Sequence, residues 1–183
     1  MMWSCRCCPA DPRRRRIGLQ TARVAIALAC SVFAPAALAG EWIADAAGCR
    51  IWNPHPQGGE SIRWSGTCVS GLAQGSGTLQ WLRNNVPYET DEGEWREGRQ
   101  VGHGTQVWPT GSYDGELIDG EPDGRGKLIL QGVRYEGSFR NGKPNGPGTL
   151  TNGNEVYEGS WTNGCFRDAT RRASFLVPRS ACR

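Results

Sequence analysis

The sequence predicts an all-β fold: an elongated single-layer antiparallel sheet of stacked β-hairpins, a solenoid with disulfide-capped ends. Three observations lead to this prediction. Glycines recur at a fixed step of 22 residues in four columns, and dipeptides that favour tight hairpin turns recur between them. Apolar and polar residues alternate along the predicted strands. The part of the chain after residue 39 shows no helical stripe, apart from a short turn near residues 42–47.

The first 39 residues have the features of a secretory signal peptide. A run of arginines precedes the apolar stretch Val24–Ala39, which ends in an Ala-x-Ala site before Gly40. This stretch is shorter than the roughly 20 apolar residues of a transmembrane helix, and it contains Pro35. We expect cleavage after Ala39 and a periplasmic or secreted protein. A retained anchor is the alternative.

Removal of this leader changes the charge of the chain. The complete sequence has 21 Lys+Arg and 18 Asp+Glu, a formal net charge of +3. The leader contains six of the basic and one of the acidic residues, so Gly40–Arg183 has 15 against 17 and a net charge of −2. Nucleic-acid binding needs a basic patch, and the mature chain offers none. We therefore expect no nucleic acid among the partners.

Four cysteines follow the leader: Cys49, Cys68, Cys165 and Cys182. An even number in an exported chain is typical of disulfides, and four cysteines allow three pairings. Because they fall in two pairs, one at each end of the repeats, Cys49–Cys68 and Cys165–Cys182 is the expected choice. Each bond would contribute roughly 3 kcal/mol through loop closure. No C-x-x-C spacing occurs among these four, so we expect no metal site.

The glycine columns define the domain organisation. One column contains Gly93, Gly115, Gly137 and Gly159, and three other columns keep the same step. An earlier unit precedes the next by 27 residues, which places a five-residue insertion near 84–88. We expect an N-terminal cap at 40–61, about five repeat units at 62–166 and a C-terminal cap or tail at 167–183.

Each unit has the pattern of a hairpin. Tyr135, Gly137 and Phe139 lie at i, i+2 and i+4, so they share one face of a strand. Asn141-Gly142 then supplies a dipeptide typical of a two-residue type I′ turn. The return strand alternates glycines with larger residues in the same phase. We expect the rings of one strand to lie on the glycines of its neighbour.

This unit resembles a MORN repeat (membrane occupation and recognition nexus), whose pattern is Tyr-x-Gly-x-Trp-x-x-Gly-x-x-x-Gly-x-Gly. Tyr157, Gly159, Trp161 and Gly164 follow the pattern, whereas Asp91 stands where the second unit should have tyrosine. The resemblance covers about 62–166, and the flanking segments resemble those of exported bacterial MORN proteins. It implies a hairpin solenoid that acts as a lipid-binding or scaffolding module.

The large aromatic side chains should share one face of the sheet, and we take them as the candidate binding residues. They are Trp81, Trp95, Trp108, Tyr113, Tyr135, Phe139, Tyr157 and Trp161. Uncovered, they would form a larger apolar patch than monomers usually expose. Three outcomes stay open: ring stacking within a tightly curled sheet, burial in a homodimer, or binding of a ligand such as a glycan or an extended peptide.

The sequence offers few groups for catalysis. Only His55 and His103 are present, one between two prolines and the other at a repeat position that varies between units. No serine lies in a G-x-S-x-G elbow, and the glycines lack the helix that follows a phosphate loop. Glutamates on the polar face make a carboxylate ladder, interpreted as solvated surface: Glu94, Glu116, Glu136 and Glu158. We predict no enzyme activity and no cofactor.

Binding through the repeat sheet is therefore the predicted function. We expect a non-enzymatic binding or scaffold protein of the cell envelope that mediates protein–protein contact or self-association, including a homodimer. A module that binds a glycan, another envelope polymer or a phospholipid is the alternative. The net charge of −2 gives an anionic membrane no electrostatic attraction. The sequence does not name the partner.

Overall fold

The computed structural model describes residues 40–182, and the expected signal peptide lies outside them, as does Arg183. This part forms strands and one short 3-10 helix, η1 (Arg179–Ala181). The strands are β1 (Glu41–Ala44), β2 (Arg50–Asn53), β3 (Glu60–Trp64), β4 (Thr67–Val69), β5 (Leu72–Arg83), β6 (Val86–Arg96), β7 (Arg99–Trp108), β8 (Gly111–Ile118), β9 (Glu121–Leu130), β10 (Val133–Arg140), β11 (Lys143–Asn152), β12 (Glu155–Thr162), β13 (Cys165–Arg167) and β14 (Arg172–Ser174).

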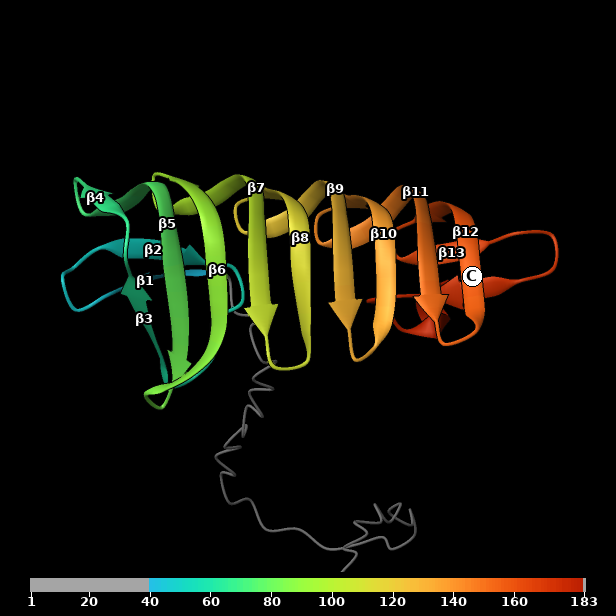
Figure 1. Cartoon of the computed structure of the whole chain (residues 1–183), viewed down its shortest axis with the longest axis horizontal. Helices are drawn as coiled ribbons and strands as arrows, with labels where there is room; N and C mark the ends of the chain where they lie inside the picture. The colour runs from blue at the N-terminus through green and yellow to red at the C-terminus, as the bar shows by residue number, and fades with distance from the viewer. Residues whose placement is uncertain (1–39, 183) are drawn as a thin grey trace, which may run out of the picture. The chain divides into compact units, whose positions relative to one another are not determined.

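These strands form one open sheet, and neighbouring strands are antiparallel as predicted, with one exception. From β5 to β12 the order in the sheet follows the order in the chain, because each strand returns beside the one before it (Figure 1). β3 and β4 both pair with β5 outside this path. The exception is β2, which meets β5 in a parallel pairing at Arg50 and Leu72. β5 therefore joins the N-terminal strands to the run of hairpins.

The predicted tight turns are confirmed. Asn141 and Gly142 have φ angles of 48° and 69°, and the dipeptides 97–98, 119–120 and 163–164 also have two positive φ angles each. A type I′ turn requires two consecutive positive φ angles, which explains why glycine recurs at its second position. The predicted insertion lengthens β5 to 12 residues and β6 to 11 around a further turn at 84–85.

Backbone hydrogen bonds join each of these turns to the hairpin before it. In three successive units the glycine N–H of the turn donates to a carbonyl on the preceding return strand: Gly120 to Gln100 at 3.0 Å, Gly142 to Pro122 at 2.9 Å and Gly164 to Pro144 at 2.8 Å. The hairpins are therefore held together at the turns as well as along the strands.

Irregularities in pairing bend the hairpins. The register shifts between Gly137 and Phe139 in β10, and β6 and β8 have shifts at equivalent places. Such bulges bend the strand that carries them. The ends of the hairpins near their turns consequently curl over one face of the sheet (Figure 1). Pro144, next to the turn of β11, is fully buried in this way.

Both disulfides form as expected. Cys49 is bonded to Cys68 beside β2, and Cys165 to Cys182 beyond the last repeat strand. The expectation of a helical turn near 42–47 was wrong, since β1 occupies Glu41–Ala44. Asp45 follows β1, and its Oδ1 accepts hydrogen bonds of 2.9 Å from the backbone N–H groups of Ala47 and Cys49. This tight turn reverses the chain toward β2.

The last long strand, β12, has a largely unpaired outer edge. It pairs with β11 along its length but with β13 only at Trp161 and Thr162. Arg171 covers part of this edge: its Nη1 donates to the Val156 carbonyl at 2.8 Å, and its guanidinium lies 5.6 Å from the centre of the Tyr157 ring. Asp168 holds the guanidinium through an ion pair of 2.9 Å.

Candidate functional site

The aromatic residues taken as candidate binding residues lie inside the molecule. Six of the eight are at most 7% exposed: Trp81, Trp95, Tyr113, Tyr135, Phe139 and Trp161. Trp108 and Tyr157 are partly buried against the cluster that contains Tyr113, Tyr135, Phe139 and Trp161. These candidate residues therefore do not form an exposed aromatic face, because the bent hairpins fold over their own rings. Of the three outcomes left open by the sequence, ring stacking within a curled sheet is the one observed.

The rings pack edge to face in a continuous chain. Tyr135 lies 5.0 Å from Phe139 and 5.3 Å from Trp161 between ring centres, and Tyr113 lies 5.4 Å from Phe139. Interplanar angles of 81–88° are typical of favourable aromatic pairs. These rings form the core, so the surface available to a partner is the opposite, polar face.

Acidic side chains recur on that polar face in one row across seven strands. The register places Glu92, Thr105, Asp114, Lys127, Glu136, Thr149 and Glu158 opposite one another in succession from β6 to β12. A carboxylate therefore stands on every second strand, two strand spacings or about 9–10 Å from the next. All four carboxylate side chains belong to exposed residues.

The carboxylate ladder expected from the sequence combined two different rows. Glu136 and Glu158 belong to the row just described, but Glu94 and Glu116 lie two residues further along their strands. Glu94 accepts a hydrogen bond of 2.7 Å from the Ser76 hydroxyl. Glu116 accepts one of 3.1 Å from the backbone N–H of Arg125. A step of 22 residues applied to the acidic residues finds the true row: Glu92, Asp114, Glu136 and Glu158.

A hollow of about 860 Å³ lies along this row. Its floor includes five glycines that the register aligns across β8 to β12: Gly115, Gly126, Gly137, Gly148 and Gly159. Its sides carry Asp114, Glu136 and Glu158 together with Arg125, Lys127 and Arg134. The aromatic rings take no part in its lining. The hollow is open to solvent. It thus offers a partner negative groups, positive groups and hydroxyl groups.

The two candidate catalytic histidines lie at the surface and far apart in the sequence. His103 Nε2 is 3.2 Å from Asp114 Oδ1 at the margin of the hollow. His55 Nε2 is 2.5 Å from Glu121 Oε1 and lines a second hollow of about 630 Å³ beside the turns of β8–β9 and β10–β11. Among residues 40–182 neither histidine hydrogen-bonds a serine or a cysteine. A nucleophile–base pair is therefore not formed by either of them in this region.

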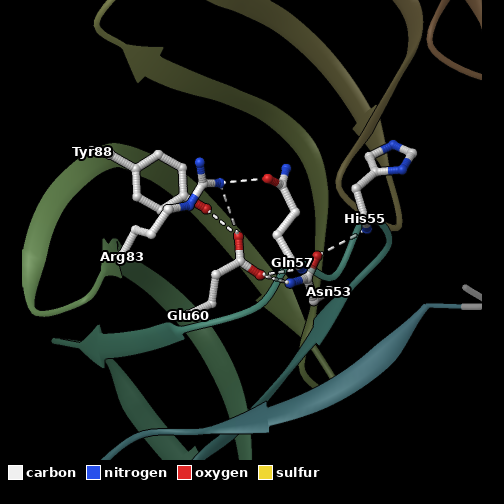
Figure 2. Close-up of polar contacts among 6 residues, drawn as sticks. All are labelled: Asn53, His55, Gln57, Glu60, Arg83 and Tyr88. Carbon is white, nitrogen blue, oxygen red and sulfur yellow. Dashed lines mark hydrogen bonds and ion pairs between the residues drawn. The ribbon is translucent and has the colours of Figure 1, made fainter. Parts of the chain in front are cut away.

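A buried polar network joins the N-terminal segment to the first hairpin, and Figure 2 shows its members. Glu60 is at its centre, with a side chain only 4% exposed. Its Oε2 accepts hydrogen bonds from Asn53 Nδ2 at 2.9 Å and the Gln57 backbone N–H at 2.8 Å, and its Oε1 accepts one from the Tyr88 hydroxyl at 2.6 Å. Arg83 Nη2 lies 3.7 Å from Oε1.

This network satisfies Glu60 completely, which marks it as a structural link rather than a reaction centre. Sequence reasoning missed it because its hydrogen-bonded partners are up to 28 residues apart and belong to no repeated column. Burial and the hydrogen bond to Glu60 raise the pKa of Tyr88 well above its ordinary value. The phenol therefore stays protonated and keeps donating to the carboxylate throughout the physiological range.

Within the described part of the chain, no three His, Cys, Asp or Glu side chains are grouped so that they could hold a metal ion. None of the helices in residues 40–182 is long and apolar enough to cross a membrane.

Comparison with known protein families identifies the repeat. Residues 92–112, 113–131 and 135–155 each match the sequence model of the MORN repeat. These segments begin on β6, β8 and β10 and contain the acidic residues of the row up to Glu136. No curated protein matches the chain.

Proposed function

We propose that this chain, with its three MORN repeats, is a non-enzymatic scaffold protein of the cell envelope that binds a protein partner on the polar face of its repeat sheet. The observation that carries the proposal is the row of carboxylates on every second strand along a hollow of about 860 Å³. MORN repeats are commonly protein- or membrane-binding modules. The two disulfides support a location outside the reducing cytoplasm.

The charges suggest what kind of partner fits. A protein surface or extended segment with basic groups about 9–10 Å apart would meet Asp114, Glu136 and Glu158 together. Lys127 and Arg125 stand between these carboxylates, so acidic groups of the partner would be accommodated at alternate positions. Because contacts of this kind are solvent-accessible, they increase the specificity and the rate of association more than the affinity. Binding should therefore weaken as salt is added.

In self-association, the protein partner is a second copy of this chain. Such a contact would use the polar face or a sheet edge, because the rings are buried. A second candidate ligand is a glycan of the envelope, favoured by the width of the hollow and by Thr149 and Thr151 in its lining. Phospholipid is less favoured, because exposed carboxylates would repel an anionic membrane. No cofactor enters either proposal.

Site-specific photo-crosslinking in cells tests the proposal. A photoreactive amino acid at Thr149, inside the hollow, should yield a covalent adduct with another protein, and one at the exposed turn residue Asn154 serves as the matched control. Charge reversal by Asp114→Lys together with Glu136→Lys should abolish the Thr149 adduct and leave the fold intact by circular dichroism. An adduct of twice the chain mass identifies a second copy.

The opposite results are equally informative. Equal crosslinking from Thr149 and Asn154, insensitive to charge reversal, would contradict binding at the hollow. Absence of any protein adduct, combined with charge-dependent retention on purified envelope polysaccharide, would replace the protein partner with the glycan candidate.

A further inference from the structure

An acidic residue occupies a core position in the first part of the sheet. Asp91 on β6 stands in the column that contains Tyr113 and Tyr135 in later units, and it is only 4% exposed. Its cross-strand neighbours are Leu79 on β5 and Gln106 on β7. A carboxylate in such surroundings needs several hydrogen-bond donors to replace its lost water.

Asp91 has only one donor of that kind. The Trp81 indole Nε1–H donates to its Oδ2 at 2.7 Å, and its Oδ1 is buried without a donor. In later units a tyrosine ring lies over the paired glycines, whereas here the Gln100 side chain lies against Gly93 and Gly104. The orphaned oxygen is unusual, since buried polar atoms almost always find a partner.

A second acid lies beside the carboxyl group of Asp91. Glu89 lies two residues earlier on β6, opposite Trp81, and its carboxyl group is within hydrogen-bonding reach of Asp91. Two ionised carboxylates cannot hydrogen-bond each other, so one of the pair must carry a proton. Placing the proton on Asp91 Oδ1 turns the orphaned oxygen into a donor to Glu89.

The charged groups around the pair do not neutralise it. From β3, Glu60 adds a third carboxylate, which already takes donors from Asn53, Gln57 and Tyr88. From β5, Arg83 lies against the Tyr88 ring and Glu60, at 4.7 Å and 3.7 Å.

The remaining neighbours add little positive charge. His55, on the segment before β3, is engaged by Glu121. From β7 the neighbouring side chains are the neutral Gln100 and Gln106, which hydrogen-bond each other.

The pKa shifts of the two acids also favour a proton on Asp91. Burial raises the pKa of Asp91 well above its ordinary value, and the charge of Glu89 raises it further. Burial also raises the pKa of Glu89, while the hydrogen bond from Asp91 opposes that shift. Asp91 is therefore the proton carrier and Glu89 the acceptor.

We propose that Asp91 and Glu89 share one proton and that this proton locks the joint between the N-terminal strands and the repeats, which makes the joint sensitive to pH. The location supports the second part of this statement. Trp81 and Leu79 belong to β5, the strand on which β2, β3 and β4 all pair, and Asp91 belongs to the first repeat strand beside it. Loss of the proton leaves two adjacent negative charges in the core across this joint.

The sign of the pH dependence follows from linkage. The folded chain keeps a proton that the unfolded chain releases above about pH 4, so the folded state binds more protons. Its stability from this pair is complete at low pH and is lost as pH rises through the folded-state pKa of Asp91. For one proton, the unfolding equilibrium constant rises up to tenfold per pH unit in that window.

Urea unfolding of the oxidised chain at several pH values tests the lock. In Asp91→Asn the amide donates to Glu89 permanently, so this variant should lack the pH dependence of the pair. The ratio of unfolding constants, variant to wild type, should therefore fall up to tenfold per pH unit as pH rises above about 4, until the folded-state pKa of Asp91 is passed. Glu92→Gln, at an exposed position on the same strand, is the matched control and should give a nearly constant ratio. His55→Ala removes the histidine as a source of the slope.

A second measurement reports on the pair directly. The Nε1–H resonance of Trp81 should shift with pH in the wild type, because its acceptor changes charge, and should stay in place in Asp91→Asn. If Asp91→Asn does not fold, Glu89→Gln, which removes the neighbouring charge but leaves Asp91 buried, should reduce the pH dependence without abolishing it. A constant ratio of unfolding constants for the acid variants, or a Trp81 resonance indifferent to pH in the folded wild type, would overturn the proposal.

Discussion

The Tyr135 ring occupies the space that a side chain at Gly148 would need, and Tyr113 stands in the same relation to Gly126 one unit earlier. Gly137 pairs with Gly148, so the ring lies over two glycine backbones on adjacent strands. An added methyl group would collide with the hydroxyl end of Tyr135, which is itself fully buried. The glycine column that contains Gly126 and Gly148 therefore provides the space in which the tyrosine rings pack.

Gly148→Ala should destabilise the fold for this reason. Overpacking of a buried site costs about 1–3 kcal/mol. Gly58→Ala is the control, since a Cβ there meets no atom within 4 Å. Urea denaturation should show the loss for residue 148 and a near-neutral effect for residue 58. Equal midpoints for the two variants would show that the ring yields freely.

Removal of single tyrosine hydroxyls should separate two kinds of hydrogen bond. The Tyr113 hydroxyl donates to the Glu116 carbonyl at 2.8 Å, a neutral bond worth about 1 kcal/mol. The Tyr88 hydroxyl donates to the Glu60 carboxylate, and bonds to charged groups are worth about 1.5–3 kcal/mol. Tyr88→Phe should therefore cost more stability than Tyr113→Phe in thermal unfolding. The reverse order would mean that Glu60 does not depend on Tyr88.

Buried phenols should make the protein sensitive to alkali. Burial raises the pKa of Tyr135 to about 12, and burial together with nearby carboxylates raises that of Tyr113 further. Because the unfolded phenol ionises near pH 10, this contribution to stability is complete below that pH and declines as pH rises toward the folded value. Phenolate absorbance should consequently appear together with loss of the circular dichroism of the folded sheet. Ionisation of Tyr135 at its ordinary pKa in a folded chain would contradict this.

The N-terminal disulfide should behave as a single unit. Cys49→Ser and Cys68→Ser should each cost about 3 kcal/mol, and the double variant should cost no more than either one. Chemical denaturation of the three variants measures this. Additive losses would mean that the two cysteines stabilise the cap independently. The pair Cys165 and Cys182 provides a parallel test at the other end.

Arg171 should protect the exposed edge of β12. Without its side chain the Val156 carbonyl is free, and unpaired edges promote association between chains. Arg171→Ala should therefore raise the solution mass or the rate of aggregation, as measured by light scattering after size-exclusion chromatography. Arg172→Ala removes the same charge from the neighbouring position and should leave the mass unchanged. Matching behaviour of the two variants would assign the effect to net charge.

The repeats were predictable because their cause is local. A fixed step of glycines and the Asn-Gly turns specify strand length, turn type and phase, and the disulfides followed from the position of the cysteines relative to the repeats. Burial of the rings could not be derived in this way, because it depends on the bulges at Gly137 and its equivalents, which bend each hairpin. Periodicity alone does not distinguish a flat sheet from a bent one.

The polar sites were harder to predict for two separate reasons. The acidic row can be found in the sequence at a step of 22 residues. The prediction instead joined Glu116 to Glu136, although the two residues lie in different rows of the sheet. The pairing of Asp91 with Trp81 had no such signal, because the indole comes from the preceding strand and the two residues meet only in the folded sheet. Where a unit departs from the repeat pattern, contacts with residues distant in the sequence thus determine its structure.

The hydrogen bonds between turns all point the same way, from Gly120, Gly142 and Gly164 back to carbonyls nearer the amino end. Each hairpin consequently finds its acceptor on a neighbour that is already complete when the chain emerges with its amino end first. Growth of the sheet from the amino end therefore forms these hydrogen bonds in order, but burial of each ring is completed only when the next unit packs on it, as Trp161 does on Tyr135. Removal of a unit at the carboxyl end would leave the earlier turn hydrogen bonds in place and uncover the rings of the hairpin before it.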